Sequence, residues 1–183
     1  MNPMIPALRN ERASEPPIAA VAAKLLCDEM LQRLGRWLRA AGYDTVIAEG
    51  GKRDRDLLAR AIRESRVLIT RDRKLAEHRS ADGSVVVLRA NGLEACVVEL
   101  TERLGIDWLL NPFTRCVLCN AELAPLPPAL LSAIPPSLAA SGADLHHCPL
   151  CWKLFWKGGH VERMRRRLES WQRLGQAPAQ HFT

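Results

Sequence analysis

Hydrophobic and polar residues follow a strand–helix alternation from Lys24 onward. An apolar run over residues 24–27 leads into residues 29–42, where apolar positions recur every three or four residues up to Gly42. This pattern predicts a strand followed by an amphipathic helix. Similar patterns predict strands over residues 43–48, 66–70 and 84–90, and helices over residues 56–65, 73–78 and 92–105. We therefore expect an α/β fold with a mainly parallel sheet, helices on both faces and right-handed crossovers.

The alternation ends after Trp108, where cysteine pairs, prolines and tryptophans take its place. We expect a second, small module from about Asn111, with a final helix that begins near Val161. The predicted organisation is a flexible extension over residues 1–23, an α/β domain over 24–110, the small module with its helix over 111–175, and a tail over 176–183.

Composition narrows the class of protein. The chain has 183 residues, of which 48% are hydrophobic and 25% charged, and these values exclude wholesale disorder, collagen and a coiled-coil rod. The 21 uncharged residues from Leu123 to Ala143 are long enough to cross a bilayer, but five prolines interrupt them. The N-terminus lacks the basic region of a signal peptide. We expect neither a membrane span nor export.

The cysteines provide the strongest chemical signal. Two Cys-x-x-Cys pairs are separated by 28 residues, and each can present two thiolates from a tight knuckle: Cys116 and Cys119, then Cys148 and Cys151. Four soft ligands suit a closed tetrahedral Zn²⁺ site, so we predict a structural zinc ribbon that the ion folds. The alternatives are a redox dithiol or two disulfides, and His146 or His147 could replace a thiolate.

The other two cysteines are not expected to bind metal. Cys27 and Cys96 each lie alone in an apolar element, where we expect them to be small buried hydrophobic residues. Unpaired cysteines of this kind are typical of a reducing compartment, so we predict a cytoplasmic protein.

Acidic residues follow the predicted strands. Asp28 ends the first strand, Asp72 follows the third, and Asp56 lies in the first turn of the helix after the second, with Asp54 as its competitor. Because the carboxyl ends of parallel strands share one edge, these acids can converge. Hard oxygen ligands suit Mg²⁺ or Mn²⁺, which can align a phosphodiester and activate water. The alternative is ordinary capping of helices and turns.

Basic residues lie beside Asp72. Arg71, Arg73 and Lys74 surround it and could hold substrate phosphates or neutralise the carboxylate.

Five sequence segments, taken together, resemble those of a known protein family. CDEMLQRLGRWLRAAGYDT, RDLLARAIRESRVLITRDRKL, TRCVLCNAEL, CPLCWKLFWKGGH and ERM occur in this order between about Leu25 and Met164. They resemble the PIN-like ribonuclease family of the Mut-seven C-terminal domain type. The resemblance implies a PIN-type α/β fold with an appended zinc ribbon and a metal-dependent ribonuclease activity. It also implies an acidic site of Asp28, Asp56 and Asp72, and zinc ligation by the four paired cysteines.

PIN nucleases often carry a fourth acidic residue, and this chain offers four candidates for it: Glu29, Asp54, Asp82 and Glu94.

Positive charge gathers near the C-terminus. The whole chain carries +6, and residues 153–173 alone carry seven basic residues against two acidic ones. Val161, Met164, Leu168 and Trp171 form an apolar stripe on the final helix, and four arginines point away from it: Arg163, Arg166, Arg167 and Arg173. These arginines could face an anion or simply form a solvated surface.

Aromatic residues and lysines alternate just after the last cysteine. Trp152, Phe155 and Trp156 alternate with Lys153 and Lys157, a pattern that suits base stacking and phosphate contact with single-stranded RNA. The same aromatics could instead form the small core of the ribbon.

These observations favour a cytoplasmic, metal-dependent ribonuclease. The acids would hold Mg²⁺ or Mn²⁺, Arg71, Arg73 and Lys74 would contact the phosphate, and the ribbon and final helix would bind RNA, with structured RNA such as tRNA or ribosomal RNA as one class of target. The first alternative is a non-catalytic RNA- or ribosome-binding zinc-ribbon protein. The second is a protein adaptor that uses the proline-rich loop.

Overall fold

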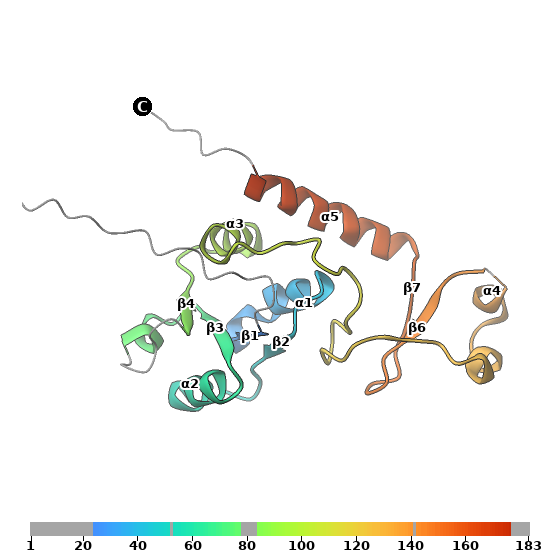
Figure 1. The fold of residues 1–183 in the computed structure, drawn as a ribbon, viewed down its shortest axis with the longest axis horizontal. Helices are drawn as coiled ribbons and strands as arrows, with labels where there is room; N and C mark the ends of the chain where they lie inside the picture. The colour runs from blue at the N-terminus through green and yellow to red at the C-terminus, as the bar shows by residue number, and fades with distance from the viewer. Residues whose placement is uncertain (1–23, 52, 78–83, 141, 177–183) are drawn as a thin grey trace, which may run out of the picture.

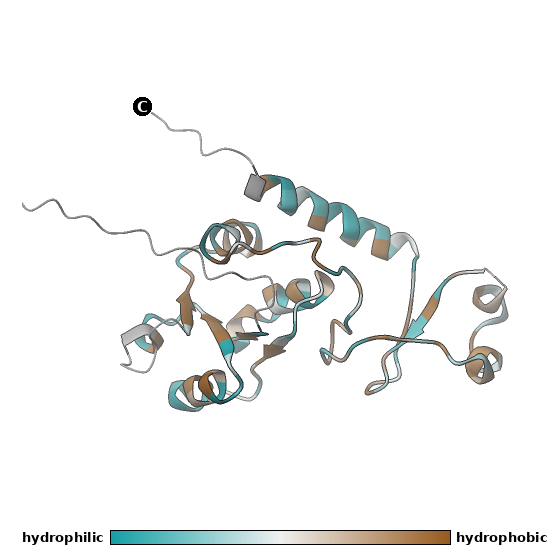
Figure 2. Ribbon diagram, in the orientation of Figure 1, coloured by the Kyte–Doolittle hydropathy of each residue, from teal (hydrophilic) through white to brown (hydrophobic). Residues whose placement is uncertain are grey.

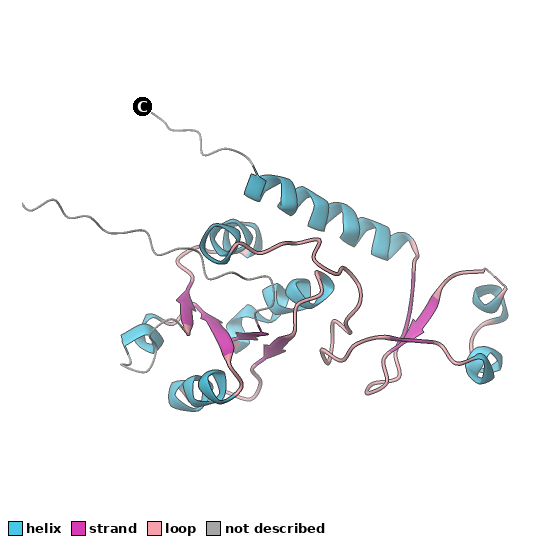
Figure 3. Ribbon diagram, viewed as in Figure 1, coloured by secondary structure: helices cyan, strands magenta, loops and turns pink. Residues whose placement is uncertain are grey.

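The computed structural model describes residues 24–51, 53–77, 84–140 and 142–176. Four parallel strands form the central sheet in the order β2-β1-β3-β4, with β1 at Lys24–Cys27, β2 at Thr45–Ile47, β3 at Arg66–Thr70 and β4 at Val85–Val87. The helices between them are α1 (Gln32–Ala40), α2 (Asp54–Arg63) and α3 (Leu93–Leu104). The predicted α/β fold with a parallel sheet is confirmed (Figures 1 and 3).

Alternating side chains of the strands fill two separate cores. Leu25 and Ile69 face the larger core with α1 and α3, whereas Leu26 and Leu68 face the smaller core with α2. All four side chains are fully buried, as expected for parallel strands covered on both faces. Figure 2 shows the hydrophobic residues concentrated in these strands.

The predicted boundaries differ in small ways from the observed ones. The segment that opens the first predicted helix begins with a 3₁₀ turn at Glu29–Leu31, and the segment after β3 forms a 3₁₀ helix at Arg73–Glu77. The predicted flexible extension over residues 1–23 and tail residues 177–183 lie outside the described residues.

Gly42 ends α1 where the second module approaches the first. Its φ of 105° disfavours a residue with a side chain, and an added Cβ would lie 2.4 Å from the carbonyl oxygen of Asn111. The close approach places the beginning of the second module directly against the end of α1.

The second module is mostly loop, as Figure 3 shows. It contains an antiparallel sheet in the order β5-β6-β7, with β5 at Ala124–Pro125, β6 at Leu145–His147 and β7 at Leu154–Trp156. The proline-rich segment forms a 3₁₀ helix at Pro128–Ala133 and the short helix α4 at Pro136–Ala139. Within the described ranges, no helix combines the length and apolarity that a membrane span requires.

Helix α5 (Gly159–Gln176) returns from the ribbon to the α/β domain (Figure 1). Leu168 and Trp171 are buried in the larger core, where the Trp171 ring packs edge-on against Trp37 and Trp108 at centroid distances of 4.8 and 5.1 Å. The predicted apolar stripe therefore docks α5 on the domain that precedes the ribbon.

Candidate functional site

Asp28 and Asp72 follow neighbouring strands of the central sheet. Cys27 of β1 pairs with Ile69 of β3, and the Asp28 N–H continues this ladder by donating to the Ile69 carbonyl at 3.0 Å. Since the two strands are parallel, both aspartates lie at the carboxyl edge of the sheet, where ligands bind in open α/β folds.

The buried Thr70 connects these two aspartates. Its hydroxyl donates to Asp28 Oδ2 at 2.7 Å and accepts from the Asp72 N–H at 3.0 Å. Asp72 Oδ1 accepts from the Lys74 N–H at 2.9 Å. Within the described part of the chain, neither aspartate forms an ion pair. Two ordered carboxylates whose charge is not neutralised therefore share one edge.

Asp56 lies apart from this pair. It occupies the first turn of α2, its side chain is 49% exposed, and its Oδ2 is 3.6 Å from Arg53 Nε. Among the described residues, four cysteines are the one group of three or more His, Cys, Asp or Glu side chains placed to hold an ion. The structure thus brings Asp28 and Asp72 together but does not gather all three aspartates into one cluster.

Two candidates for the fourth acid have other partners. Glu29 Oε2 accepts from the Gly51 N–H at 2.8 Å and ties the loop before α2 to the end of β1. Glu94, in α3, is bonded by Arg167 and Trp171 of α5. Burial raises the pKa of Glu94, but these two hydrogen bonds outweigh it and leave the pKa lowered. Asp82 lies outside the described residues.

The four predicted zinc ligands come together in the second module. The Sγ atoms of Cys116, Cys119, Cys148 and Cys151 all lie within 4.8 Å of one another. Cys116 and Cys151 are 3.6 Å apart, and Cys119 and Cys148 are 3.2 Å apart, much longer than the S–S bond of about 2.05 Å in a disulfide. Thiolates around a tetrahedral zinc lie about 3.8 Å apart, since each Zn–S bond is about 2.3 Å. The donor set and spacing fit zinc.

Local hydrogen bonds favour the thiolate state of one member of this cluster, Cys148, whereas burial raises the pKa of Cys116 and Cys119. Burial by itself would raise the pKa of Cys148, but the Cys151 N–H and the Cys119 thiol donate to its sulfur and lower the pKa to about 6. Cys27 behaves in the opposite way, because full burial raises its pKa to about 12 and keeps it a neutral thiol.

His146 and His147, the two histidines considered as zinc ligands, do not belong to the cysteine group. His147 is buried, its Nδ1 lies 3.2 Å from the Ala124 carbonyl oxygen, and its ring stacks on Trp152. His146 Nδ1 lies 3.6 Å from Asp144.

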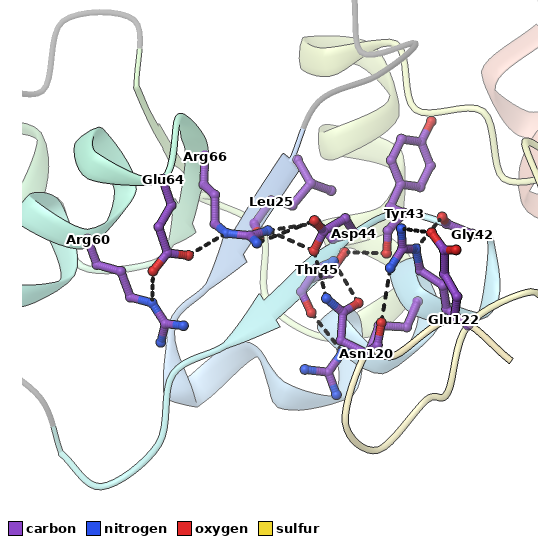
Figure 4. Close-up of polar contacts among 12 residues, drawn as sticks. Leu25, Gly42, Tyr43, Asp44, Thr45, Arg60, Glu64, Arg66, Asn120 and Glu122 are labelled. Carbon is purple, nitrogen blue, oxygen red and sulfur yellow. Dashed lines mark hydrogen bonds and ion pairs between the residues drawn. The ribbon is translucent and has the colours of Figure 1, made fainter. Parts of the chain in front are cut away.

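A polar network fixes the first cysteine knuckle to the α/β domain (Figure 4). Asn120 donates to Asp44 at 2.6 Å and accepts from the Thr45 N–H at 3.0 Å. Arg39, a buried residue of α1, donates to the Thr45 carbonyl and to the carbonyls of Val117 and Leu118 inside the knuckle. The knuckle is therefore held by side chains from both modules.

Most of the basic residues predicted to contact RNA have exposed side chains. Arg71, Arg73 and Lys74 lie at the carboxyl edge, and within the described ranges they form no ion pair. The same holds in the ribbon and α5 for four further cations: Lys153, Lys157, Arg163 and Arg166.

Arg167 has a different environment. Its guanidinium pairs with Glu94 and lies over the rings of Trp37 and Trp171 at 5.5 and 5.3 Å from their centroids. This side chain helps to dock α5 on the α/β domain.

The fold and the cysteine group together define an α/β domain with a parallel sheet, followed by a four-cysteine module that could hold a metal ion and by a basic C-terminal helix. The family model described as the Mut7-C RNAse domain matches residues 23–168, which is most of the chain. The protein belongs to this family. A search of curated proteins found no match.

Sequence reasoning missed the residues that organise the site. The sequence pattern places Thr70 at the end of a strand, Arg39 in a helix and Asn120 beside a cysteine pair, and it indicates no further role for them. The TRD sequence did contain a signal for Thr70, because a hydroxyl two residues before an aspartate can bond its backbone.

Proposed function

We propose that this protein is a metal-dependent ribonuclease that hydrolyses RNA phosphodiester bonds at the edge marked by Asp28 and Asp72. Family membership supports the ribonuclease class. The observation that carries the proposal is a pair of aspartates that follow adjacent parallel strands and are linked through Thr70, which donates to the Asp28 carboxylate and accepts from the Asp72 N–H. Neither carboxylate has an ion-pair partner in the described part of the chain. A purely structural capping role would not require two uncompensated charges at the ligand-binding edge of the sheet.

The pair fits the chemistry of Mg²⁺ or Mn²⁺. Mg²⁺ in proteins is commonly held by one or two carboxylates, with water and substrate phosphates completing the coordination. Asp28 and Asp72 would supply these carboxylates. Asp56 at the start of α2 lies apart from the pair in this structure and would have to approach it to act as a third ligand. When bound, the ion would lower the pKa of a water molecule and offset charge on the phosphate.

The protein's own residues would position the RNA around this pair. Thr70 holds Asp28 in place through its hydroxyl. Arg71, Arg73 and Lys74 are exposed beside Asp72, where they would contact the scissile phosphate. The exposed cations of the ribbon and α5 would bind RNA farther along: Lys153, Lys157, Arg163 and Arg166. We leave Arg167 out of this set because it pairs with Glu94.

We further propose zinc as the ion of the cysteine group and a structured RNA, such as tRNA or ribosomal RNA, as the target. The free thiols support a reducing location, and we place the protein in the cytoplasm.

The test is cleavage of RNA with added Mn²⁺ by the native chain and by Asp28→Asn and Asp72→Asn. Both substitutions remove charge but keep side-chain size, so cleavage should fall by at least about 100-fold while RNA binding persists. Glu102→Gln is the control, because Glu102 is an exposed residue of α3 outside the edge. Asp56→Asn compared with Asp54→Asn decides which acid of α2 takes part.

Absence of cleavage by the native chain, together with tight and salt-sensitive RNA binding, would overturn the nuclease proposal in favour of a non-catalytic RNA-binding module. Equal cleavage by the native chain and the Asp72→Asn variant would remove this edge as the site.

A further inference from the structure

A cavity of about 340 Å³ lies where the ribbon meets the beginning of α5. Its walls come from the segment that precedes the first knuckle, from β6 and β7, and from the first turns of α5. None of its lining residues belongs to the acidic edge. The volume lies at the small end of the range for ligand sites, roughly 300–1,000 Å³.

Aromatic rings supply much of the lining: Phe113, Phe155 and Trp156. Trp156 is 44% exposed although it is a large hydrophobic residue. Phe113 has a φ of 64°, a left-handed backbone conformation that is unfavourable for a bulky residue. Its N–H donates to the Ala40 carbonyl at 2.8 Å, which holds the strained backbone in place. The fold thus keeps an aromatic ring at the cavity despite an energetic cost.

Basic side chains line the same cavity as these rings. Arg165 places its guanidinium 5.3 Å from the centroid of the Phe113 ring, and Lys157 and His160 also line the cavity. Arg115 lines it too, but its guanidinium is occupied by Gly42, Asn120 and Glu122. The one lining carboxylate, Asp144, lies near His146. A planar, apolar ligand that also carries negative charge matches this lining better than a neutral apolar one.

We propose that this cavity binds one unpaired nucleobase of the RNA, with the adjoining phosphates on Lys157 and Arg165. The inference rests on the proposed function in taking RNA as the ligand, and it adds a base-binding site separate from the site of cleavage. Nucleobases stack on aromatic and guanidinium planes, while the phosphates beside them pair with cations. Rings and cations here line one cavity, which is the combination of groups that such a nucleotide requires.

The experiment separates base contacts from phosphate contacts. The zinc-loaded full chain is titrated, without added Mg²⁺ or Mn²⁺, with a short single-stranded RNA and with an abasic oligomer of equal length and charge. Trp156→Ala should weaken RNA binding roughly 5- to 100-fold, the range that stacking of one base is worth, and should leave abasic binding unchanged. Phe113→Leu, which keeps an apolar side chain, should act in the same direction.

Two controls isolate the cavity. Leu150→Ala removes an exposed hydrophobic side chain of the same ribbon that does not line the cavity, so the ratio of the two affinities should remain that of the native chain. Arg166→Gln should weaken both oligomers about equally, because it removes a phosphate contact only. Zinc content and circular dichroism establish that each variant is folded.

Equal affinity of the native chain for RNA and abasic oligomer would overturn the base-binding site. So would Trp156→Ala and Phe113→Leu variants that are folded and retain the full preference for RNA. A chain that cleaves RNA but shows no base preference contradicts this inference alone. A chain that prefers RNA over the abasic oligomer but never cleaves it contradicts the nuclease proposal alone. Failure to bind either oligomer contradicts both.

Discussion

Thr70 lies at the end of β3 with its hydroxyl between two aspartates, donating to Asp28 and accepting from the Asp72 N–H. Its side chain is fully buried, so water cannot replace a hydrogen-bond partner that the hydroxyl loses. A hydroxyl that serves two groups at once also restrains their relative position. Thr70 is therefore a positioning residue of the acidic edge.

Replacing Thr70 by valine keeps the shape of the side chain and removes the hydroxyl. The Asp28 carboxylate loses a donor and the Asp72 N–H loses an acceptor, so we expect the free energy of unfolding to fall by about 1–3 kcal/mol. Cleavage should fall roughly 10- to 100-fold because the carboxylates are less well placed. Chemical unfolding and the Mn²⁺ cleavage assay measure the two effects.

Thr70→Ser is the matched control, since it restores the hydroxyl and should recover most of the cleavage. Recovery of activity by serine without full recovery of stability would be consistent with positioning. Full activity of the folded Thr70→Val protein would show that the hydroxyl has only a structural role.

The acids and cysteines could be predicted from the sequence because each rests on a local rule. Asp28 and Asp72 follow apolar runs, and the two Cys-x-x-Cys pairs repeat a recognisable spacing. The partner of Arg167 could not be predicted in this way. It pairs with Glu94, which is 73 positions distant in the sequence, and no periodicity connects an acid of α3 with an arginine of α5.

Long-range packing is also hard to predict from the sequence for a whole element, as helix α5 illustrates. Its apolar stripe was evident from three-and-four spacing, and Leu168 and Trp171 are indeed buried. Figure 2 shows the rest of the helix as largely hydrophilic. The spacing of apolar residues predicts only that one face of α5 is buried. It does not indicate whether that face packs on the α/β domain or on the ribbon.

The first knuckle and β2 are joined by charged contacts at the amino ends of the strands. Arg66 donates to Asp44 at 2.8 Å and to Glu64 at 2.8 Å, and Asp44 in turn accepts from Asn120 (Figure 4). Burial raises the pKa of Asp44, but the hydrogen bonds from Arg66 and Asn120 outweigh it and leave the pKa lowered. Hydrogen bonds from Arg66 and then Arg60 lower the pKa of Glu64 to about 2.

These shifts predict a pH dependence of stability. A carboxylate whose pKa is lower in the folded state stabilises the fold above its unfolded pKa, near 4, and loses this contribution as the pH falls toward the folded pKa. The native chain should therefore lose stability from about pH 5 down to about pH 2. Asp44→Asn should be less stable at pH 7 by about 1–3 kcal/mol and show a shallower decline in acid.

Urea unfolding at a series of pH values measures the two slopes. Any release of metal from the cysteine group in acid would be common to both proteins, so the difference between their slopes isolates the carboxylate. Glu102→Gln is the control, because Glu102 is exposed and forms no ion pair with a described residue. Identical slopes for the native chain and Asp44→Asn would contradict the role given to this contact.

In the molecule as a whole, the ribbon is anchored to the α/β domain through its first knuckle and through α5, in addition to the backbone bonds of Asn111 and Phe113 to the end of α1. The first knuckle is held by Arg39 and Asn120, and α5 packs against α3 and the larger core. The ribbon has few buried apolar side chains of its own, with Cys116 and Cys148 among those fully buried. Small modules with so little core depend on a metal or a similar cross-link for stability.

Removal of the ion should therefore unfold the ribbon and weaken the domain that holds it. We expect a chelator at pH 7 to release one zinc per chain and to open the amides of β6 and β7 to hydrogen exchange. The central strands β1 and β3 should remain protected, because their cores include no residue of the two cysteine knuckles or of β5, β6 and β7. The melting temperature of the remaining fold should still fall, since Arg39 loses the knuckle carbonyls that it bonds and Asp44 and Thr45 lose Asn120.

Cysteine variants make this test specific. Cys116→Ser with Cys119→Ser should abolish zinc binding and reproduce the exchange pattern of the chelated protein, since it removes half of the ligand set. Cys96→Ala should bind zinc as the native chain does, because Cys96 lies in α3 outside the cysteine group. Protection of β6 and β7 that survives the loss of zinc would mean that contacts with the α/β domain alone fold the ribbon. In that case the ion would serve something other than stability, and the cysteine group would have to be reconsidered as a site of chemistry.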